Sequence, residues 1–144
     1  MKVEKMRITM YSPDKMYGFA KNPKTGNEVF FHLGEFRWMD EGVPPPVIGE
    51  WVEAEWDPER PKKGSAIRAR RVSRLAEPDH VAGTVITFDS KRGYGFIRSQ
   101  EGTEYYLHRS EVEDNSLPVV GDRVTFYAGF KKGKPRACYV TRVS

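Results

Sequence analysis

Apolar and polar residues alternate over short stretches of this chain, and Gly, Pro, Asp and Asn residues interrupt those stretches. Residues 85–88 and 123–127 are two examples. Because successive side chains on a strand point to opposite faces of a sheet, this alternation predicts strands with one face in a core. No stretch of useful length has the spacing of an amphipathic helix. We therefore predict an all-β chain.

Two aromatic motifs occur twice, in the same order. In the first copy, Lys15–Ala20 (KMYGFA) precedes Val29–His32 (VFFH), and in the second, Arg92–Ile97 (RGYGFI) precedes Tyr105–His108 (YYLH). Between the copies the first motif shifts by 77 positions and the second by 76. The chain is therefore predicted to be an internal repeat of one structural unit.

Strand geometry decides where the repeated rings point. Tyr17 and Phe19 share one face of their strand, and Phe30 and His32 share one face of the next. If the alternate residues, Val29 among them, fill the core, these four side chains lie together on a solvent face. In the second copy the corresponding residues are Tyr94, Phe96, Tyr106 and His108.

An exposed cluster of rings is costly unless it binds something. Flat rings offer a stacking surface to unpaired bases, and cations at the rim attract phosphates. Lys15, Arg92 and Arg109 are the rim cations predicted for this role. The repeated unit is thus expected to bind single-stranded nucleic acid.

The same residues resemble the cold-shock domain family. In the second repeat, 83–89 looks like the first strand of that domain, 91–97 and 105–108 like its two ribonucleoprotein motifs, and 121–126 and 135–140 like its last two strands. The first repeat is a divergent relative, with 6–11, 49–56 and 69–72 as the corresponding strands. The resemblance implies two tandem five-stranded barrels of the oligonucleotide-binding (OB) fold.

The chain departs from the family pattern at stacking positions. A tryptophan common in the first strand is replaced by Met10 and Thr87, and the aromatic that commonly follows the histidine is replaced by Leu33 and Arg109. Met16 stands where the family motif has glycine. Each repeat is therefore expected to bind more weakly than a full-pattern domain, and tandem linkage compensates for this.

We predict a first domain over residues 1–72, a linker over 73–80 and a second domain over 81–144. A chain that already holds two domains has less need to dimerise, so a monomer is expected.

The net charge is only +4, so stacking is expected to supply much of the affinity. Basic residues cluster near the last hairpin of each repeat, as phosphate contacts or as solvated turn charges: Lys62, Lys63, Arg68, Arg70 and Arg71, and Lys131, Lys132, Lys134 and Arg136.

Two features of the first repeat leave alternatives open. In the irregular stretch 34–48, Phe36 and Trp38 either stack on a ligand from a mobile loop or cap the open end of the barrel. Trp51 and Trp56, with an acidic strip, suggest a protein-docking surface. We interpret the strip as a solvated strand and hairpin face; it comprises Asp40, Glu41, Glu50, Glu53, Glu55, Asp57 and Glu59.

Other functional classes find little support. His32 and His108 lie in different repeats, so they are not expected to act as an acid–base pair, and we predict no enzyme and no catalytic residue. No Cys or His pair has zinc spacing, so neither metal nor cofactor is expected. The single Cys138 and the lack of a secretory signal or membrane-length apolar run predict a cytoplasmic protein.

The sequence therefore predicts a protein that binds single-stranded RNA or DNA with little sequence specificity, and the resemblance implies a nucleic-acid chaperone. The alternative is a protein-interaction module in which the first repeat docks a partner and only the second binds nucleic acid. The sequence leaves the choice between RNA and DNA open, since stacking reads base faces and ignores the 2′-hydroxyl.

Overall fold

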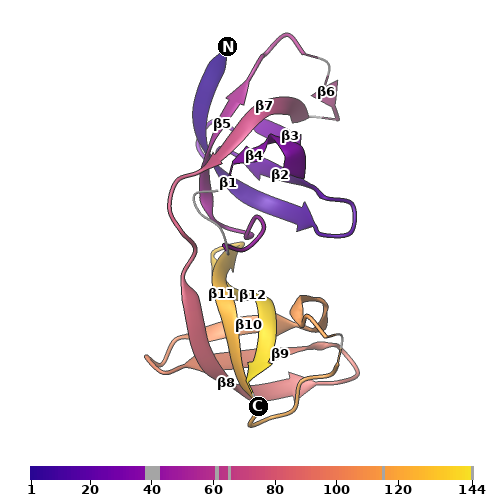
Figure 1. The fold of residues 1–144 in the computed structure, drawn as a ribbon, viewed down its shortest axis with the longest axis vertical. Coiled ribbons are helices and arrows are strands. Elements are labelled where there is room, and N and C mark those ends of the chain that lie inside the picture. Colours follow the sequence, from indigo (N-terminus) through magenta and orange to yellow (C-terminus); the bar gives the residue numbers. More distant parts are fainter. Residues whose placement is uncertain (38–42, 61, 65, 115, 144) are drawn as a thin grey trace. The chain divides into compact units, whose positions relative to one another are not determined.

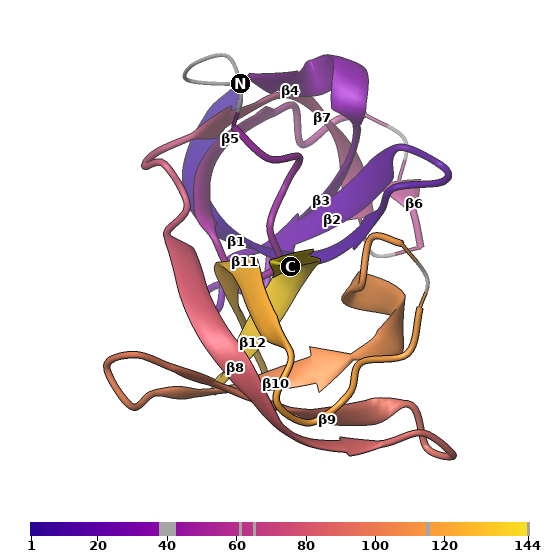
Figure 2. The same ribbon diagram turned by 60° about the horizontal axis from the view of Figure 1, so that its bottom comes forward.

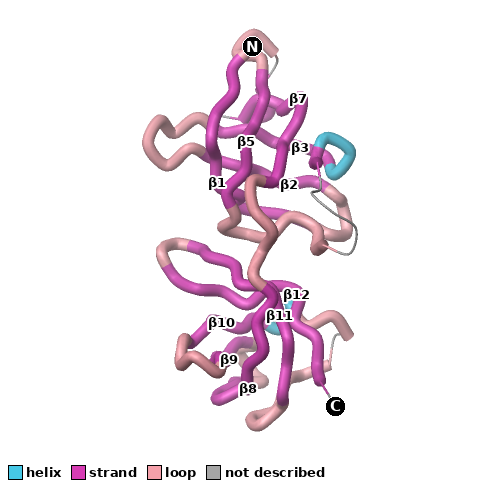
Figure 3. Tube along the Cα trace, turned by 60° about the vertical axis from the view of Figure 1, so that its left-hand side comes forward, coloured by secondary structure: helices cyan, strands magenta, loops and turns pink. Residues whose placement is uncertain are grey.

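The computed structural model describes residues 1–37, 43–60, 62–64, 66–114 and 116–143. Strands dominate these residues, and the helices among them are two three-residue 3₁₀ turns (Figure 3). This confirms the prediction of an all-β chain. Contacts divide the chain into two compact units, Met1–Glu77 and Pro78–Ser144 (Figure 1). None of the described helices has the length and apolar character needed to cross a membrane.

The first unit is a barrel in which the strand order is β3-β2-β1-β5-β7 and a parallel pairing of β3 with β7 closes the ring (Figure 2). A 3₁₀ turn over Leu33–Glu35 follows β3, and two short strands, β4 and β6, pair with β7. The strands are β1 (Lys2–Ser12), β2 (Tyr17–Lys21), β3 (Glu28–His32), β4 (Phe36–Arg37), β5 (Trp51–Trp56), β6 (Lys62–Lys63) and β7 (Ala66–Arg74).

The second unit has the same connectivity. Its strands form the closed barrel β10-β12-β11-β8-β9, with β10 and β12 parallel, and a 3₁₀ turn over Arg109–Glu111 follows β10. The strands are β8 (His80–Asp89), β9 (Tyr94–Ser99), β10 (Glu104–His108), β11 (Arg123–Lys131) and β12 (Lys134–Val143). The prediction of two five-stranded OB-type barrels is confirmed. The domain limits 1–72 and 81–144 remain a prediction, and strand residues occupy both ends of the segment 73–80.

Strand alternation sorts the side chains as predicted. In β3, Val29 and Phe31 are fully buried, while Phe30 and His32 point outward. In β10, Leu107 is buried and Tyr105 packs its ring edge against Phe126 in the core, with ring centroids 4.8 Å apart. Each barrel therefore has its own apolar core, and the outward rings of the two motifs, such as Phe30 and Tyr106, lie outside it.

The structure decides two open points of the first repeat. Phe36 is 2% exposed and stacks on Phe31, with centroids 6.0 Å apart, so it caps the core and is not a ligand-stacking residue. Trp38 lies outside the described residues. Trp56 is buried, so it was wrong to count it as part of an exposed docking surface. It shares the inward face of β5 with Val52 and Ala54.

A buried ion pair between Glu50 and Arg74 attaches the long loop of the first unit to β7. Glu50 was predicted to belong to a solvated acidic strip, and for this residue the prediction was wrong. The Arg74 side chain is fully buried and donates from Nε and Nη2 to the two Glu50 oxygens, each at 2.8 Å. Arg74 also donates to the carbonyls of Pro44 and Pro45, and Glu50 accepts from the amide of Val47. Pairing and these hydrogen bonds compensate the desolvation of both charges.

The second unit contains the corresponding pair in a more exposed form. Val52 lies opposite Arg74 across β5 and β7, and Val124 lies opposite Arg142 across β11 and β12. The Arg142 guanidinium approaches Asp122 at 3.3 Å and donates to the carbonyl of Leu117, but its side chain is 32% exposed. The same connection thus exists in both units, and only the first places it in the core.

Replacing Arg74 with Met removes the charge, keeps most of the side-chain volume and leaves the Glu50 carboxylate buried without its partner. We expect the first unit to lose about 3–5 kcal/mol of unfolding free energy. All three tryptophans, Trp38, Trp51 and Trp56, lie in this unit, so denaturant unfolding followed by tryptophan fluorescence reports its stability.

Two variants serve as controls. Arg71 forms a surface pair with Glu55 at 3.5 Å, so Arg71→Met is expected to cost at most about 1 kcal/mol. The double variant Arg74→Met with Glu50→Met is expected to recover much of the lost stability, since no unpaired charge remains in the core. Equal losses in Arg71→Met and Arg74→Met would show that the buried pair has no special weight.

Candidate nucleic-acid interface

Two neighbouring strands of the second unit carry four rings on their outer face, which we term the second platform. Tyr94 and Phe96 lie on β9, and Tyr106 and His108 lie directly opposite them on β10. Tyr94 stacks with Tyr106, with centroids 5.8 Å apart and planes 19° apart, and Phe96 meets the edge of Tyr106 at 6.0 Å. Phe96 is 37% exposed. The sequence prediction that these four rings share one face is confirmed.

Gly95 allows the two rings of β9 to flank a tight crossing with β8. A Cβ atom at this position would lie 2.0 Å from the carbonyl oxygen of Thr87 and 2.7 Å from Cα of Phe88, so no side chain fits. The pairing shifts register between Val85 and Thr87 at this point. Close backbone approach thus explains the glycine between the rings.

The first unit presents the corresponding first platform. Tyr17 and Phe19 lie on β2, opposite His32 and Phe30 on β3. Phe19 meets Tyr17 edge-on at 6.0 Å and Phe30 at 6.3 Å with planes 51° apart. Met10 lies opposite Phe19, where the resemblance expects a tryptophan. Of these two pairs one is edge-on and the other is tilted, whereas the second platform includes a stacked pair.

Both platform histidines also cap the 3₁₀ turn that follows them. Nδ1 of His32 accepts from the amide of Gly34 at 3.0 Å, and Nδ1 of His108 accepts from the amide of Ser110 at 3.1 Å. Because Nδ1 accepts a hydrogen bond, the proton of each neutral ring is on Nε2. The caps fix the ring orientation and leave Nε2–H as the available donor.

A glutamate three residues after each histidine links this turn to the last strand of its barrel, β7 in the first unit and β12 in the second. Glu35 forms a bidentate pair with Arg68 at 3.1 and 3.0 Å, and Glu111 lies 3.5 Å from Arg136. The parallel pairing places Arg68 opposite Phe30 and Arg136 opposite Tyr106. The Arg136 guanidinium lies 5.3 Å from the centroid of the Tyr106 ring.

Sequence reasoning named these arginines only as members of basic clusters and missed the glutamates as platform residues. The repeated His-x-x-Glu motif, at His32–Glu35 and His108–Glu111, was the available signal. It predicts a capped turn, because a residue three positions after an N-cap can bond back to it. Glu35 does so by accepting from the His32 amide at 3.1 Å.

The pKa values of the first-unit pair reflect this contact. Burial tends to raise the pKa of Glu35, but hydrogen bonds from Arg68 and the His32 amide, with the Arg68 charge, hold it below its ordinary value of 4.5. The hydrogen bond and charge of Glu35 in turn raise the pKa of Arg68. The pair is therefore ionised in the folded state near neutral pH.

The three predicted rim cations are all exposed. Lys15 lies in the turn between β1 and β2, and Arg92 lies 3.9 Å from Asp89 in the turn before β9. Arg109 begins the turn after His108, and its methylenes cover Gly93. Each cation thus lies next to a platform strand in the chain.

A groove extends the second platform toward the β11–β12 hairpin. Its lining combines the aromatic residues Phe96 and Tyr106 with basic residues of the hairpin. The remaining lining residues are Glu104, Lys131, Lys132, Lys134, Pro135 and Arg136. Rings and cations therefore face one space, which suits a base and its phosphate.

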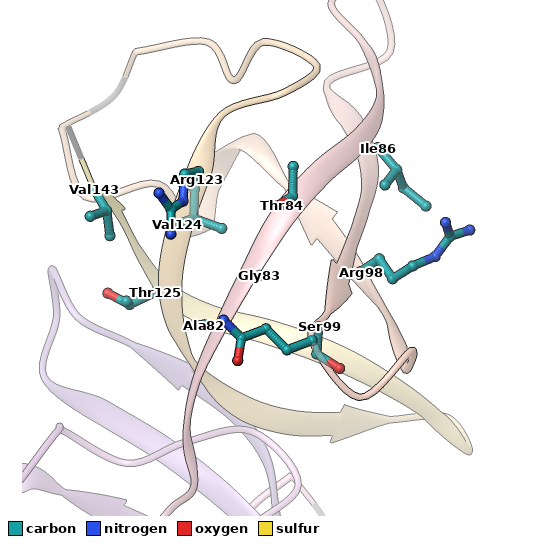
Figure 4. A pocket seen from close by; sticks show the side chains of 11 residues that line it. Ala82, Gly83, Thr84, Ile86, Arg98, Ser99, Arg123, Val124, Thr125 and Val143 are labelled. Carbon is teal, nitrogen blue, oxygen red and sulfur yellow. The ribbon is translucent and has the colours of Figure 1, made fainter.

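A different hollow of the second unit lacks this combination. Its lining includes Arg123 of β11 and Arg98 of β9, which lie on either side of β8 (Figure 4). Its lining also includes Ile86 and Val143 but no aromatic side chain. It therefore offers no stacking surface.

Comparison with known proteins agrees with this geometry. Residues 81–143 match the model of the 'Cold-shock' DNA-binding domain family. The chain is similar to a cold shock-like protein of Thermotoga maritima, with 38% identity over 60 residues that cover 40% of this chain and 91% of that protein. The chain belongs to the cold-shock domain family. The repeated strand pairing identifies the first unit as a second, divergent cold-shock-type copy.

One further curated protein and one solved structure are similar to this chain. A major cold shock protein of Streptococcus pyogenes is 28% identical over 64 residues, which are 43% of this chain and 96% of that protein. A solved structure described as drosophila Unr CSD456 has 21% identity and a TM-score of 0.41, covering 99% of this chain and 63% of that chain. This chain therefore spans less than two thirds of that structure. Family membership supports nucleic-acid binding as the general class of function.

The lowered pKa of Glu35 predicts how stability depends on pH. The pair with Arg68 stabilises the first unit fully above about pH 4.5, and this contribution is lost as the pH falls through the lowered pKa of the folded state. Glu35→Gln is therefore expected to make the first unit less stable at pH 7 and to reduce its loss of stability on acidification. Arg68→Gln is expected to do the same. Tryptophan-monitored unfolding from pH 7 to 3 measures this, and unchanged pH profiles in both variants would contradict the assignment.

Proposed function

We propose that this cold-shock-type protein binds single-stranded RNA or DNA with little sequence specificity, through both platforms. The observation that carries the proposal is the second platform, where the stacked pair Tyr94–Tyr106 and the exposed Phe96 open onto a groove lined by basic residues. Bases of any identity have faces that stack on rings, whereas duplex bases are already stacked on each other.

The proposed roles follow from the positions of the side chains. The eight rings of the two platforms stack bases: Tyr17, Phe19, Phe30, His32, Tyr94, Phe96, Tyr106 and His108. Lys15, Arg92 and Arg109 contact phosphates at the rims. The histidines serve as stacking rings and as Nε2–H donors, with Nδ1 committed to the capped turn. A binding role without catalysis fits this arrangement, and a nucleic-acid chaperone is the corresponding biological activity.

Two linked platforms bind one strand more tightly than either platform alone. Once one unit holds the strand, the second binding event is intramolecular. Each OB-type unit covers about 4–16 nucleotides, so affinity is expected to rise again when an oligonucleotide is long enough for both units. This compensates for the first platform, whose two ring pairs are edge-on and tilted and not stacked.

Phe96→Ala tests the stacking assignment. Base stacking on such rings contributes about 1–3 kcal/mol per base, so affinity for an unstructured single strand is expected to fall about 5- to 150-fold. Fluorescence anisotropy of a labelled oligonucleotide measures this. Val143→Ala, also exposed but at the end of β12, is the matched control and is expected to bind like the wild type. Wild-type affinity in a folded Phe96→Ala protein would contradict the role of the platform.

Protein docking through the first unit is the alternative, and Trp51 favours it. This ring is 40% exposed on the outer face of β5, with the Arg7 guanidinium 5.0 Å and the Lys5 ammonium 6.0 Å from its centroid. Under this alternative, Phe19→Ala leaves function intact and Trp51→Ala abolishes it. Under the proposed function, Phe19→Ala weakens single-strand binding and Trp51→Ala leaves it unchanged.

A further inference from the structure

Three arginines of the first unit line one hollow, which we term the arginine hollow. Arg68 and Arg70 come from β7, and Arg60 comes from the loop that precedes β6. Glu35 and Ala69 complete the lining. Arg60 donates to the carbonyl of Arg68 at 3.4 Å, which attaches the loop to the strand.

The hollow has more positive than negative charge. Three arginines line it, and Glu35, whose carboxylate pairs with Arg68, is the one acidic residue of the lining. Within the part of the chain that the structure describes, no carboxylate lies within ion-pair distance of Arg60 or Arg70. Gathering like charges is unfavourable, and an anion between them relieves the repulsion.

The hollow lies next to the first platform. The parallel pairing of β3 and β7 places Arg68 opposite Phe30, and Glu35 comes from the turn capped by His32. A strand whose base stacks on Phe30 therefore has its backbone within reach of the arginines. Guanidinium groups bind phosphate oxygens with paired, directional hydrogen bonds.

The lining of this hollow differs from that of the groove in the second unit. That groove contains Phe96 and Tyr106 together with its cations. The arginine hollow contains no ring, and its apolar contribution is limited to Ala69 and the side-chain stems. Its chemistry therefore suits a phosphate and not a base.

We propose that the arginine hollow is a phosphate site, in which Arg60, Arg68 and Arg70 hold a backbone phosphate of the strand that stacks on Phe30. This inference rests on the proposed function and names the part of the ligand that the first unit contacts beyond its rings. In the first unit, contacts between arginines and phosphate would then contribute to the affinity in addition to stacking on the rings.

The test is the double variant Arg60→Gln with Arg70→Gln, which keeps the Arg68–Glu35 pair intact. Loss of one phosphate contact is expected to reduce the slope of log affinity against log salt by about 0.7 for a single strand. Affinity at low salt is expected to fall about 10-fold, a change of about 1.4 kcal/mol. Lys2→Gln with Lys5→Gln removes the same charge from exposed residues that do not line the hollow, and its slope is expected to match the wild type.

An oligomer of abasic sugar-phosphate separates failure of this site from failure of the proposed function. Its phosphates are expected to shift the NMR signals of the Arg60 and Arg70 side chains, although it has no base to stack. Equal salt slopes in the two double variants, or no shift of these signals, would overturn the phosphate site while base-dependent binding of the wild type stands. Lack of wild-type binding to any single strand would refute the proposed function, and the abasic oligomer would still test the hollow.

Discussion

The candidate site depends on the closure of each barrel by a parallel strand pair, β3 with β7 in the first unit and β10 with β12 in the second. This pairing brings Phe30 opposite Arg68 and Tyr106 opposite Arg136, although the paired residues are far apart in the sequence. Since each strand gives alternate side chains to the core, closure fills the interior with apolar residues and leaves the rings outside. The platforms and the arginines beside them are therefore products of the same topology.

Local pattern explains which parts of this arrangement the sequence predicts. Alternation in the duplicated motifs correctly predicts that Phe30 and Tyr106 point outward while Phe31 and Leu107 point inward. The Glu50–Arg74 pair has no local signature, because its partners come from a loop and a strand end that only the closed barrel brings together. Trp51 and Trp56 point to opposite faces of β5, and the local pattern does not show which face enters the core; the structure buries Trp56.

The two units share one architecture and differ in what they offer a ligand. The second unit keeps the stacked pair Tyr94–Tyr106 and a groove that combines rings with cations. In the first unit one ring pair is edge-on and the other is tilted, and the neighbouring hollow is lined by arginines. The ion pair between the long loop and the fifth strand is buried only in the first unit. Duplication thus preserved the barrel and its closing contacts while the binding surfaces diverged.

If both platforms bind the same single-stranded molecule, NMR mapping on the intact protein detects contacts in both units. Isotope-labelled protein is titrated at physiological salt with an unstructured single strand and with a duplex of the same sequence. We expect the single strand to shift the signals of Phe19 and Phe30 in one unit and of Phe96 and Tyr106 in the other, and the duplex to bind more weakly. Shifts confined to the surroundings of Trp51, or stronger binding of the duplex, would contradict this expectation.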